Sequence, residues 1–227
     1  MQQMQFTPVT VLDNFFDDPD KIRNWALGLD YTPDPEGRWP GIRSKALHEL
    51  NSVLFQTICN KFFRLFFDPS KERVGWSVDM RFQLINNKYG SGWVHTDRHN
   101  SKITGLIYLS PNLTLSGGTS IYQEKKTVIA QEAAKEYCAI KENYYKNMLN
   151  FDIMEKNRQK HNAQYEETIR VSNVYNRLVS FDSHLFHAAQ DFFGTEEDSR
   201  LTLVFFVREL YADKTPLDKF RRYSFET

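Results

Sequence analysis

Several features that mark secreted or membrane-spanning proteins are missing from this sequence. Its 227 residues include only two cysteines, Cys59 and Cys138, which lie far apart and in no metal-binding spacing. Two lone thiols fit a reducing compartment better than a disulfide framework. The longest apolar run, residues 201–207, has the length of a strand and is too short to cross a bilayer.

A surplus of one charge is also absent. The 29 basic residues balance 29 acidic ones, so the chain lacks the positive excess of proteins that coat nucleic acid or anionic membranes. Residues 1–16 include no apolar segment of the kind found in signal peptides. These absences predict a soluble cytoplasmic protein that binds neither nucleic acid nor a membrane.

Aromatic residues, in contrast, are plentiful. The 18 Phe, 11 Tyr and 4 Trp residues can fill a substantial core and line a ligand pocket. The length suits one large domain, because all-β barrels often reach it as one unit. We therefore expect residues 1–227 to form a single domain.

Two amphipathic helices are predicted before the first long strand. Asp18 is a suitable capping residue and Pro19 a suitable first-turn residue, and apolar residues follow them at helical spacing. Asn51 caps a second predicted helix that runs to Phe67. Residues 30–46, between these helices, are rich in Pro and Gly and are expected to form a loop.

From residue 74 the apolar pattern alternates, which predicts a half-buried strand over residues 74–84. Shorter strands are predicted at residues 103–109, 119–122, 178–181 and 201–207. Strands separated by tight turns and flanked by helices indicate a mainly β, cupin-like jelly roll. We assign the regions as follows: an N-terminal helical and loop part at 1–75, the jelly-roll core at 76–208 and a C-terminal tail at 209–227.

A helical insert interrupts the strands at about residues 131–167. Apolar residues recur at helical spacing over residues 131–149, and a second, charged helix is predicted over residues 152–167. Two uses are open for this insert. It is either a solvated cover over one sheet, or a lid or homodimer surface.

The candidate metal ligands come from two distant parts of the chain. His95 and Asp97 are two residues apart, so an extended backbone places both on one face. His184 and His187 compete for a third position, and three residues of extended chain make them face opposite ways. We choose His187 because a turn of thirteen residues (200 − 187) would bring Arg200 back beside it.

These residue types suit one kind of chemistry. Two imidazoles and one carboxylate form the facial triad that holds iron(II) and leaves positions open for oxygen chemistry. The planar guanidinium of Arg200 matches the carboxylate of a keto acid. Two simpler readings stay open. His99 would complete a His-x-Asp-x-His zinc cluster, and Arg200 alone would suit a surface ion pair.

On these residues the chain resembles the iron(II)- and 2-oxoglutarate-dependent oxygenases, in particular their prolyl 4-hydroxylase-like branch. The resemblance covers about residues 76–208. It rests on five motifs: His95-Thr96-Asp97, residues 104–110 (TGLIYLS), Gly117-Gly118-Thr119, residues 177–182 (RLVSFD) leading to His187, and Arg200-Leu201-Thr202.

The resemblance implies a double-stranded β-helix in which His95, Asp97 and His187 bind iron(II). The cosubstrate 2-oxoglutarate would chelate the iron and place its distal carboxylate on Arg200. The implied reaction uses O2, hydroxylates an unactivated C–H of a small-molecule or peptidyl substrate, and releases succinate and CO2. Related halogenases have a small residue in place of the carboxylate, so the presence of Asp97 favours hydroxylation.

Two further residues match the family's cosubstrate site. Thr202 takes the hydroxyl position of the family's Arg-x-Ser pattern. Tyr108 matches a tyrosine that hydrogen-bonds the same carboxylate in this branch, with ordinary core packing as the alternative.

Two other functions were weighed. One is a cupin-like metal-binding protein without oxygenase activity. The other is a zinc-dependent hydrolase, which is disfavoured because no obvious general base accompanies the triad and Arg200 would have no role. The segment at residues 38–44 is either a structural turn or a wall of the substrate site, with Arg38 and Arg43 facing an anionic group.

Overall fold

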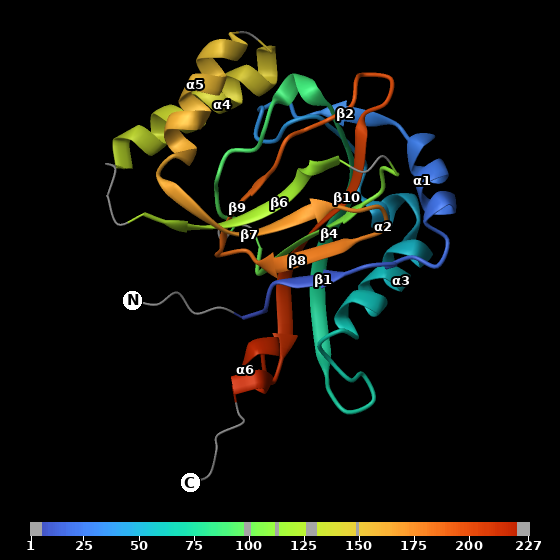
Figure 1. The fold of residues 1–227 in the computed structure, drawn as a ribbon. Coiled ribbons are helices and arrows are strands. Elements are labelled where there is room, and N and C mark those ends of the chain that lie inside the picture. Colours follow the sequence, from blue (N-terminus) through green and yellow to red (C-terminus); the bar gives the residue numbers. More distant parts are fainter. Residues whose placement is uncertain (1–5, 98–100, 112–113, 126–130, 149, 222–227) are drawn as a thin grey trace.

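The computed structural model describes residues 6–97, 101–111, 114–125, 131–148 and 150–221, which form two antiparallel sheets with helices on the outside (Figure 1). The larger sheet has seven strands in the order β1-β8-β5-β10-β4-β3-β2, and the smaller has three in the order β7-β6-β9. The larger sheet contains β1 (Thr10–Leu12), β2 (Tyr31–Pro33), β3 (Ile42–Ser44), β4 (Val74–Ile85), β5 (Ile103–Tyr108), β8 (Leu178–Asp182) and β10 (Arg200–Ala212). The smaller contains β6 (Thr114–Glu124), β7 (Tyr165–Asn173) and β9 (Phe186–Ala189). The predicted jelly roll is confirmed.

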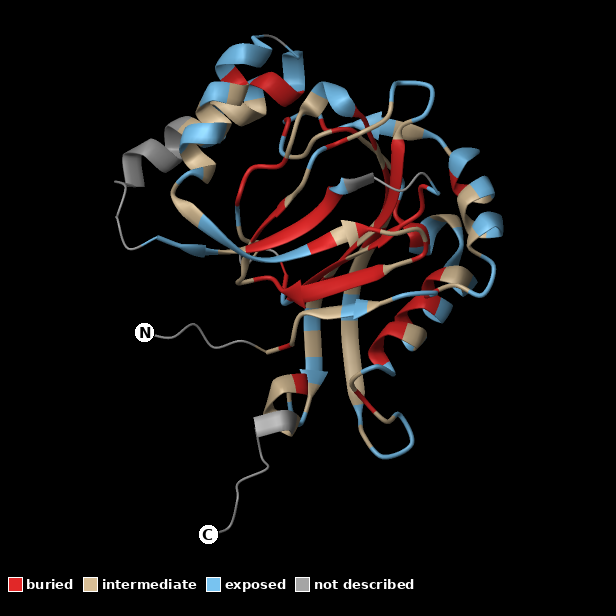
Figure 2. Cartoon of the chain, viewed as in Figure 1, coloured by how far each residue is buried: buried red, intermediate tan, exposed pale blue. Residues whose placement is uncertain are grey.

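Alternation along β10 gives the larger sheet two different faces. Leu203, Phe205 and Val207 belong to the main core, which the N-terminal helices complete. Val204 and Phe206 point the other way, into a cavity between the two sheets. Figure 2 shows the strands at the centre as the most buried part of the chain and the outer turns of the helices as exposed. One face of the sheet therefore packs into the main core, and the other lines the cavity.

The helices α1 (Pro19–Leu27), α2 (Leu47–Leu50) and α3 (Ser52–Phe63) pack against this core. The predicted caps are present: Asp18 accepts a hydrogen bond from the Lys21 amide at 3.0 Å, and Asn51 accepts one from the Leu54 amide at 2.9 Å.

The predicted end of the second helix was wrong. The helix ends at Phe63 rather than Phe67. The amides of Leu65 and Phe66 bond to carbonyls three residues back, the tighter pattern with which helices commonly finish.

The N- and C-terminal parts contribute more strand than predicted. Residues 30–46 contain β2 and β3 rather than loop alone, and β1 lies along β8 at the edge of the sheet. At the other end, residues 209–212 are not tail. They extend β10 along β4 past a bulge at Arg208 and are followed by α6 (Pro216–Arg221). These segments form strands because each pairs with another strand. Their own apolar patterns are too short to predict a strand.

The predicted helical insert is present as α4 (Gln131–Asn147) and α5 (Phe151–Asn162). Its second helix was predicted too long, since residues 165–173 form β7 and pair with β6. Trp93 and Met154 lie in the small core that joins the insert to the chain before His95. Asn162 fixes this contact with two hydrogen bonds, to the Val94 amide at 2.9 Å and the Gly92 carbonyl at 3.0 Å. The insert therefore packs against the segment that leads to His95.

Cys59 is buried, Cys138 is exposed, and both are free, as the lone-thiol reading predicts. Among the described residues, none of the helices is long and apolar enough to cross a membrane.

Candidate metal and keto-acid site

His95 and His187 are joined through their backbones. Each amide donates to the other residue's carbonyl, at 3.0 and 2.9 Å, in an isolated antiparallel bridge. His187 lies on β9, whereas His95 lies in an extended segment outside the named strands. This bridge brings together two residues that are 92 positions apart (187 − 95). The predicted juxtaposition therefore arises from backbone pairing between two distant segments.

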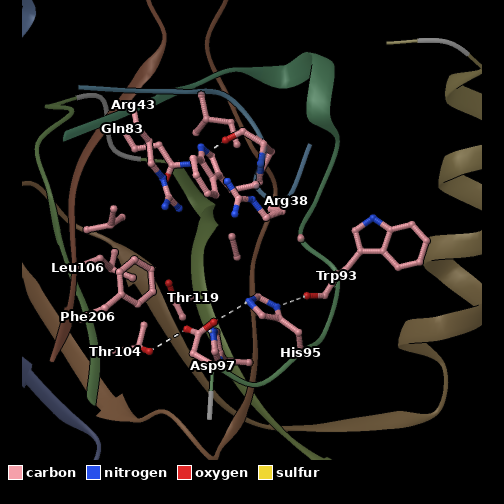
Figure 3. Close-up of a pocket in the computed structure, with 18 of the residues that line it drawn as sticks. Arg38, Arg43, Gln83, Trp93, His95, Asp97, Thr104, Leu106, Thr119 and Phe206 are labelled. Carbon is pink, nitrogen blue, oxygen red and sulfur yellow. Dashed lines mark hydrogen bonds and ion pairs between the residues drawn. The ribbon is translucent and has the colours of Figure 1, made fainter. Parts of the chain in front are cut away.

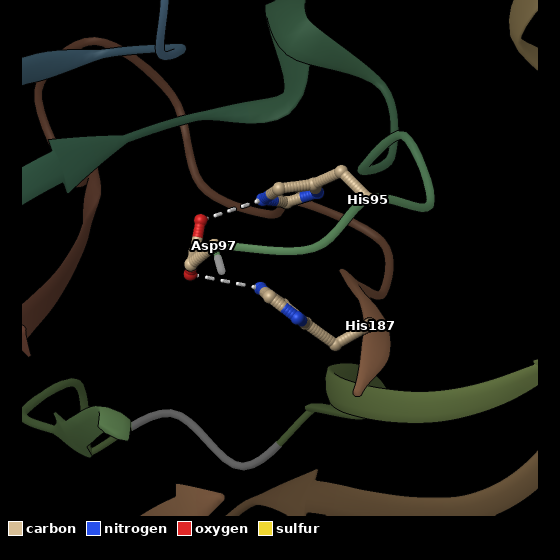
Figure 4. A group of neighbouring side chains, drawn as sticks. All are labelled: His95, Asp97 and His187. Atoms are coloured by element: carbon tan, nitrogen blue, oxygen red, sulfur yellow. Dashed lines mark ion pairs between the residues drawn. The ribbon is translucent and has the colours of Figure 1, made fainter. Parts of the chain in front are cut away.

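Asp97 lies between the two imidazoles (Figure 4). The Nε2 atom of His95 is 3.5 Å from Oδ1 of Asp97, and Nε2 of His187 is 3.2 Å from Oδ2. The ligand atoms of these three residues all lie within 4.8 Å of one another. Two nitrogens and one carboxylate at this spacing can hold one divalent ion on a single face.

The far side of each imidazole is fixed by the main chain. Nδ1 of His95 lies 2.8 Å from the Trp93 carbonyl, and Nδ1 of His187 lies 3.0 Å from the Leu185 carbonyl. A carbonyl only accepts, so each Nδ1 carries a proton and Nε2 is the nitrogen available to bind a metal. Both Nε2 atoms thus face the cluster, the arrangement typical of metal-binding histidines.

The carboxylate of Asp97 is held from the other side. The Thr104 hydroxyl on β5 donates to its Oδ2 at 2.8 Å, and the Asp97 amide donates to the Ser183 carbonyl at 2.9 Å. Burial acts to raise the pKa of Asp97, but His187 and His95 outweigh it and hold the pKa well below its ordinary value. The group is therefore a carboxylate, the form that binds a cation.

His184 is placed elsewhere. Its Nδ1 lies 2.9 Å from Oδ1 of the fully buried Asp182, and its amide donates to the same oxygen. It is not part of the cluster. The structure therefore groups His187, and not His184, with His95 and Asp97. His99, the alternative zinc partner, lies outside the described residues.

Arg200 begins β10 and is 5 % exposed. Within the part of the chain that the structure describes, its guanidinium makes no hydrogen bond or ion pair, and its Nε and Nη1 are buried without a partner. The rings of Phe192 and Tyr108 lie beside the guanidinium, with their centres 5.3 and 5.9 Å from Cζ. Burial lowers the pKa of Arg200. An unpaired buried guanidinium is costly, so this position favours an anionic ligand.

The two other predicted cosubstrate residues lie next to Arg200. Thr202 follows on the same face of β10 and is paired across the sheet with Tyr108. Its hydroxyl is buried and has no partner among the described residues. The Tyr108 hydroxyl donates to Thr119 at 2.9 Å, so in this structure it is already used within the protein.

Arg200, Thr119 and the histidine cluster all line one cavity of about 420 Å³ between the two sheets. This volume is within the usual range for small-ligand sites. Figure 3 shows Arg43 and Arg38 across the cavity from Asp97 and His95. The 38–44 segment is therefore a wall of the cavity, as one of its two readings predicted.

Several cavity residues were missed by the sequence reasoning. Lys141 and Tyr145 reach the cavity from α4, and Gln83 reaches it from β4. Lys141 and Tyr145 are four residues apart and share a helix face, but nothing in the sequence indicated which surface that face covers. Their role depends on where the insert docks.

A model of a family of unknown function, DUF6445, matches residues 2–207, and the chain belongs to this family. No curated protein matches the sequence.

Solved structures with the same fold are oxygenases and a related epimerase. HygX from Streptomyces hygroscopicus, with nickel and 2-oxoglutarate bound, is 14% identical, with a TM-score of 0.53 over 89% of this chain and 83% of that one. A prolyl hydroxylase from Trichoplax adhaerens, in complex with a peptide fragment, is 10% identical, with a TM-score of 0.52 over 95% and 87%. The alpha-ketoglutarate-dependent epimerase SnoN from nogalamycin biosynthesis is 9% identical, with a TM-score of 0.50 over 96% and 85%. These likenesses confirm the double-stranded β-helix of the 2-oxoglutarate oxygenases.

Proposed function

We propose that this chain is an iron(II)- and 2-oxoglutarate-dependent dioxygenase that hydroxylates an unactivated C–H of its substrate. The observation that carries the proposal is the buried, unpaired guanidinium of Arg200 in the same cavity as His95, Asp97 and His187. A metal cluster alone would suit many proteins. A metal cluster with an unsatisfied cation beside it suits an anionic cosubstrate that chelates the metal.

The residues of the cavity fit both iron(II) and 2-oxoglutarate. His95, His187 and Asp97 would hold iron(II) through two Nε2 atoms and one carboxylate oxygen, and their other polar atoms are already bound to Trp93, Leu185 and Thr104. Arg200 and Thr202 would hold the distal carboxylate of 2-oxoglutarate. When bound, iron(II), 2-oxoglutarate and O2 supply the oxidising chemistry of the reaction, and succinate and CO2 leave.

The protein's own contribution is orientation and exclusion of water. The backbone bridge between His95 and His187 fixes the spacing of the two imidazoles, and Thr104 fixes the carboxylate between them. The rings of Phe192 and Tyr108 flank Arg200 and shield it from solvent. A shielded guanidinium binds a carboxylate more strongly than an exposed one, because less water competes.

Other reactions on this site are less well supported. Asp97 is the only carboxylate among the described residues that line the cavity, and as a ligand it could not also be the general base of a zinc hydrolase. A cupin-like metal-binding protein without oxygenase activity would have no use for an unpaired Arg200. Hydroxylation is proposed over halogenation because Asp97 occupies a ligand position.

The fold is compatible with more than one class of substrate. HygX has been solved with hygromycin B and the Trichoplax adhaerens enzyme with a peptide, so both a small molecule and a peptide are compatible with the fold. A cytoplasmic location and a homodimer stay predictions from the sequence.

The test is succinate formation from 2-oxoglutarate by the full chain with iron(II) and O2. We expect succinate above the level of an Asp97→Ala control, because Asp97 is a proposed ligand of the iron. Activity with zinc(II) alone towards ester or amide substrates would instead support the hydrolase. Metal binding with no 2-oxoglutarate binding in calorimetry would support the cupin-like alternative.

A further inference from the structure

Two arginines of the 38–44 segment line the cavity, but their surroundings differ. Arg38 donates two side-chain hydrogen bonds to the buried carboxylate of Asp34, at 3.1 and 2.9 Å, and its own side chain is 59% exposed. The charge of Arg38 is therefore already neutralised. Arg43 has no such partner: within the described residues, its guanidinium makes no hydrogen bond or ion pair, and its Nε is buried.

Arg43 is held in place by stacking and by strand pairing. Its Cζ lies 4.4 Å from the ring centre of Trp39 and 5.7 Å from that of Phe206. Its backbone is paired with Gln83 of β4, whose side chain donates to the Pro40 carbonyl at 2.6 Å. A guanidinium only donates hydrogen bonds. A fixed, unpaired guanidinium in a cavity wall is therefore a site for an acceptor, and an anionic oxygen suits it best.

A second cation reaches the same cavity from the helical insert. Lys141 of α4 lines it, and no described residue forms an ion pair with its ammonium. The insert and the loop are in tight contact at Gly37, where a Cβ would lie 2.3 Å from the carbonyl oxygen of Glu142. Glu142 follows Lys141 directly, so this contact fixes the helix turn that carries the lysine beside the arginine-bearing loop.

More cationic than anionic residues therefore line the cavity. Five cationic residues line it: Arg38, Arg43, Lys141, Arg200 and Arg208. Arg38 and Arg208 are bound to Asp34 and Asp79, and Arg200 is assigned to the cosubstrate. Asp97 is the only carboxylate among the described lining residues, and the histidines use it. Arg43 and Lys141 form no ion pair with any described residue. The carboxylates of Asp79, Asp97 and Asp34 act on Arg43 electrostatically, but none of them pairs with it.

We propose that Arg43 and Lys141 bind an anionic group of the substrate, a carboxylate or a phosphate, while the apolar body of the substrate packs along Trp39, Leu106 and Phe206. That this ligand is the substrate rests on the proposed function. The binding of the anion itself does not. Figure 3 shows Arg43 on the side of the cavity opposite Asp97 and His95, so an anion held there directs the rest of the molecule towards the cluster.

The experiment uses calorimetry on the full chain with four probes: acetate, benzoate, inorganic phosphate and phenyl phosphate. Each is titrated into the protein with nickel(II) and saturating 2-oxoglutarate, so that the Arg200 position is filled, and again without 2-oxoglutarate. With 2-oxoglutarate we expect one saturable anion site, which depends on Arg43. Without it, the same site should remain and the open Arg200 position should add a second. The aromatic probes should bind more tightly than the bare anions, and the tighter of benzoate and phenyl phosphate identifies the anion.

Variants assign the site to its residues. Arg43→Gln should weaken probe binding by roughly 10- to 100-fold, the loss of a charged hydrogen bond, and Arg43→Lys should recover part of it. Lys141→Gln should weaken binding by a smaller factor. Arg170→Gln, on a surface arginine already bound to Glu167, and Lys146→Gln, elsewhere on α4, are the matched controls. Thermal unfolding of each variant shows whether it folds.

The outcomes separate this inference from the function. Arg43-dependent probe binding in a chain that does not bind 2-oxoglutarate would support the anion site and contradict the dioxygenase. Binding of 2-oxoglutarate with no second anion site, or with one unaffected in folded Arg43→Gln and Arg43→Lys, would overturn the inference and leave the dioxygenase intact. Tighter binding of benzylamine than of benzoate would also overturn it.

Discussion

The two sides of the cavity differ in how their charges are satisfied. On one side, His95, Asp97 and His187 are held by hydrogen bonds from the core of the jelly roll, and every polar atom not aimed at the cluster has a partner. We call this the triad side. On the other, Arg43 comes from β3 and Lys141 from the helical insert, and their cationic groups form no hydrogen bond or ion pair with the described residues. We call this the arginine side.

This difference separates what is fixed from what can vary. On the triad side, His187 lies on β9 of the smaller sheet, and Thr104, which holds Asp97, lies on β5 of the larger sheet, so the geometry depends on how the two sheets face each other. On the arginine side, Arg43 lies on β3 near the edge of the larger sheet and Lys141 on the insert, where a change of length or sequence costs the core less. The chemistry is therefore assigned to the jelly roll, and the choice of substrate to the loop and the insert.

The largest effect should come from removing the carboxylate on the triad side. Asp97→Ala is expected to lower succinate formation by roughly three orders of magnitude or more, since metal-dependent steps depend on several kcal/mol of stabilisation. The fold should persist, because the side chain lies at the cavity and not in the core. Asp213→Ala, at an exposed carboxylate, is the control. Full iron-dependent activity in Asp97→Ala would show that the triad is wrongly assigned.

Variants of the two histidines near β9, His184 and His187, test the triad side through their affinity for iron(II). His187→Ala should weaken iron(II) binding more than about 100-fold, because even residues that only support a ligand contribute 10- to 100-fold. His184→Ala should keep most of the affinity, since its ring is bound to Asp182. Metal titration of both variants decides between them, and the reverse order would move the third ligand to His184.

Under the proposed function, Arg200 binds the distal carboxylate of the 2-oxoglutarate that chelates the iron on the triad side. Arg200→Ala should raise the KM for 2-oxoglutarate by about one and a half to three and a half decades, from the roughly 2–5 kcal/mol lost with a buried charged partner. Arg200→Lys should recover only part, because an ammonium lacks the planar fork. Iron affinity should change little.

Stability provides an independent readout at Arg200. Without 2-oxoglutarate, Arg200→Met should unfold at a temperature equal to or higher than that of the wild type, because an unpaired buried charge is removed. Adding 2-oxoglutarate and metal should raise the unfolding temperature of the wild type more than that of the variant. Equal 2-oxoglutarate binding by wild type and Arg200→Ala in calorimetry would remove the main support for the dioxygenase.

The contact that joins the loop to the insert can be disrupted by adding one Cβ atom at Gly37. Gly37 has φ +67°, and a Cβ there would meet the Glu142 carbonyl oxygen at 2.3 Å. Gly37→Ala should lower the free energy of unfolding by roughly 1–3 kcal/mol and weaken anion binding at Arg43 more than 2-oxoglutarate binding at Arg200. Gly28→Ala is the matched control, since its nearest contact would be an ordinary 3.5 Å. Equal loss of both ligands would show that the two sides are not separable.

The smallest effect is expected at Thr202. Thr202→Val should raise the KM for 2-oxoglutarate roughly fivefold, for about 1 kcal/mol from one lost hydrogen bond, with up to twice that energy against a carboxylate. Its hydroxyl has no partner among the described residues, so valine should not destabilise the ligand-free chain. Thr57→Val, on the exposed face of α3, controls for the substitution itself. An effect as large as that of Arg200→Ala would contradict this order.

Much of the jelly roll could be predicted because its local signals are strong. The alternation over residues 74–84 and the caps Asp18 and Asn51 each reflect a local rule, and each was found where expected. The strands β1, β2, β3, β7 and β9 were not predicted. All but β7 are three or four residues long, and such short segments become strands only because a partner strand lies beside them. The nine residues of β7 were partly assigned to a helix, and their pairing with β6 makes them a strand.

The sequence by itself determined the identities of the candidate ligands and their spacing along the chain, because side-chain chemistry and an extended i, i+2 pair are local properties. Only the tertiary structure decided which charges have partners. Arg38, before β3, and Arg43, on β3, lie five positions apart and look equivalent in sequence, yet Asp34 neutralises the first and none of the described residues pairs with the second. The same holds for Lys141, whose position in the cavity wall depends on α4 docking against Gly37. The pair of Asp34 and Arg38 is local, since these residues are four positions apart. Whether Arg43 and Lys141 find a partner depends instead on which distant segments lie within a few ångströms of them, and this is fixed only when the sheets close and the insert docks.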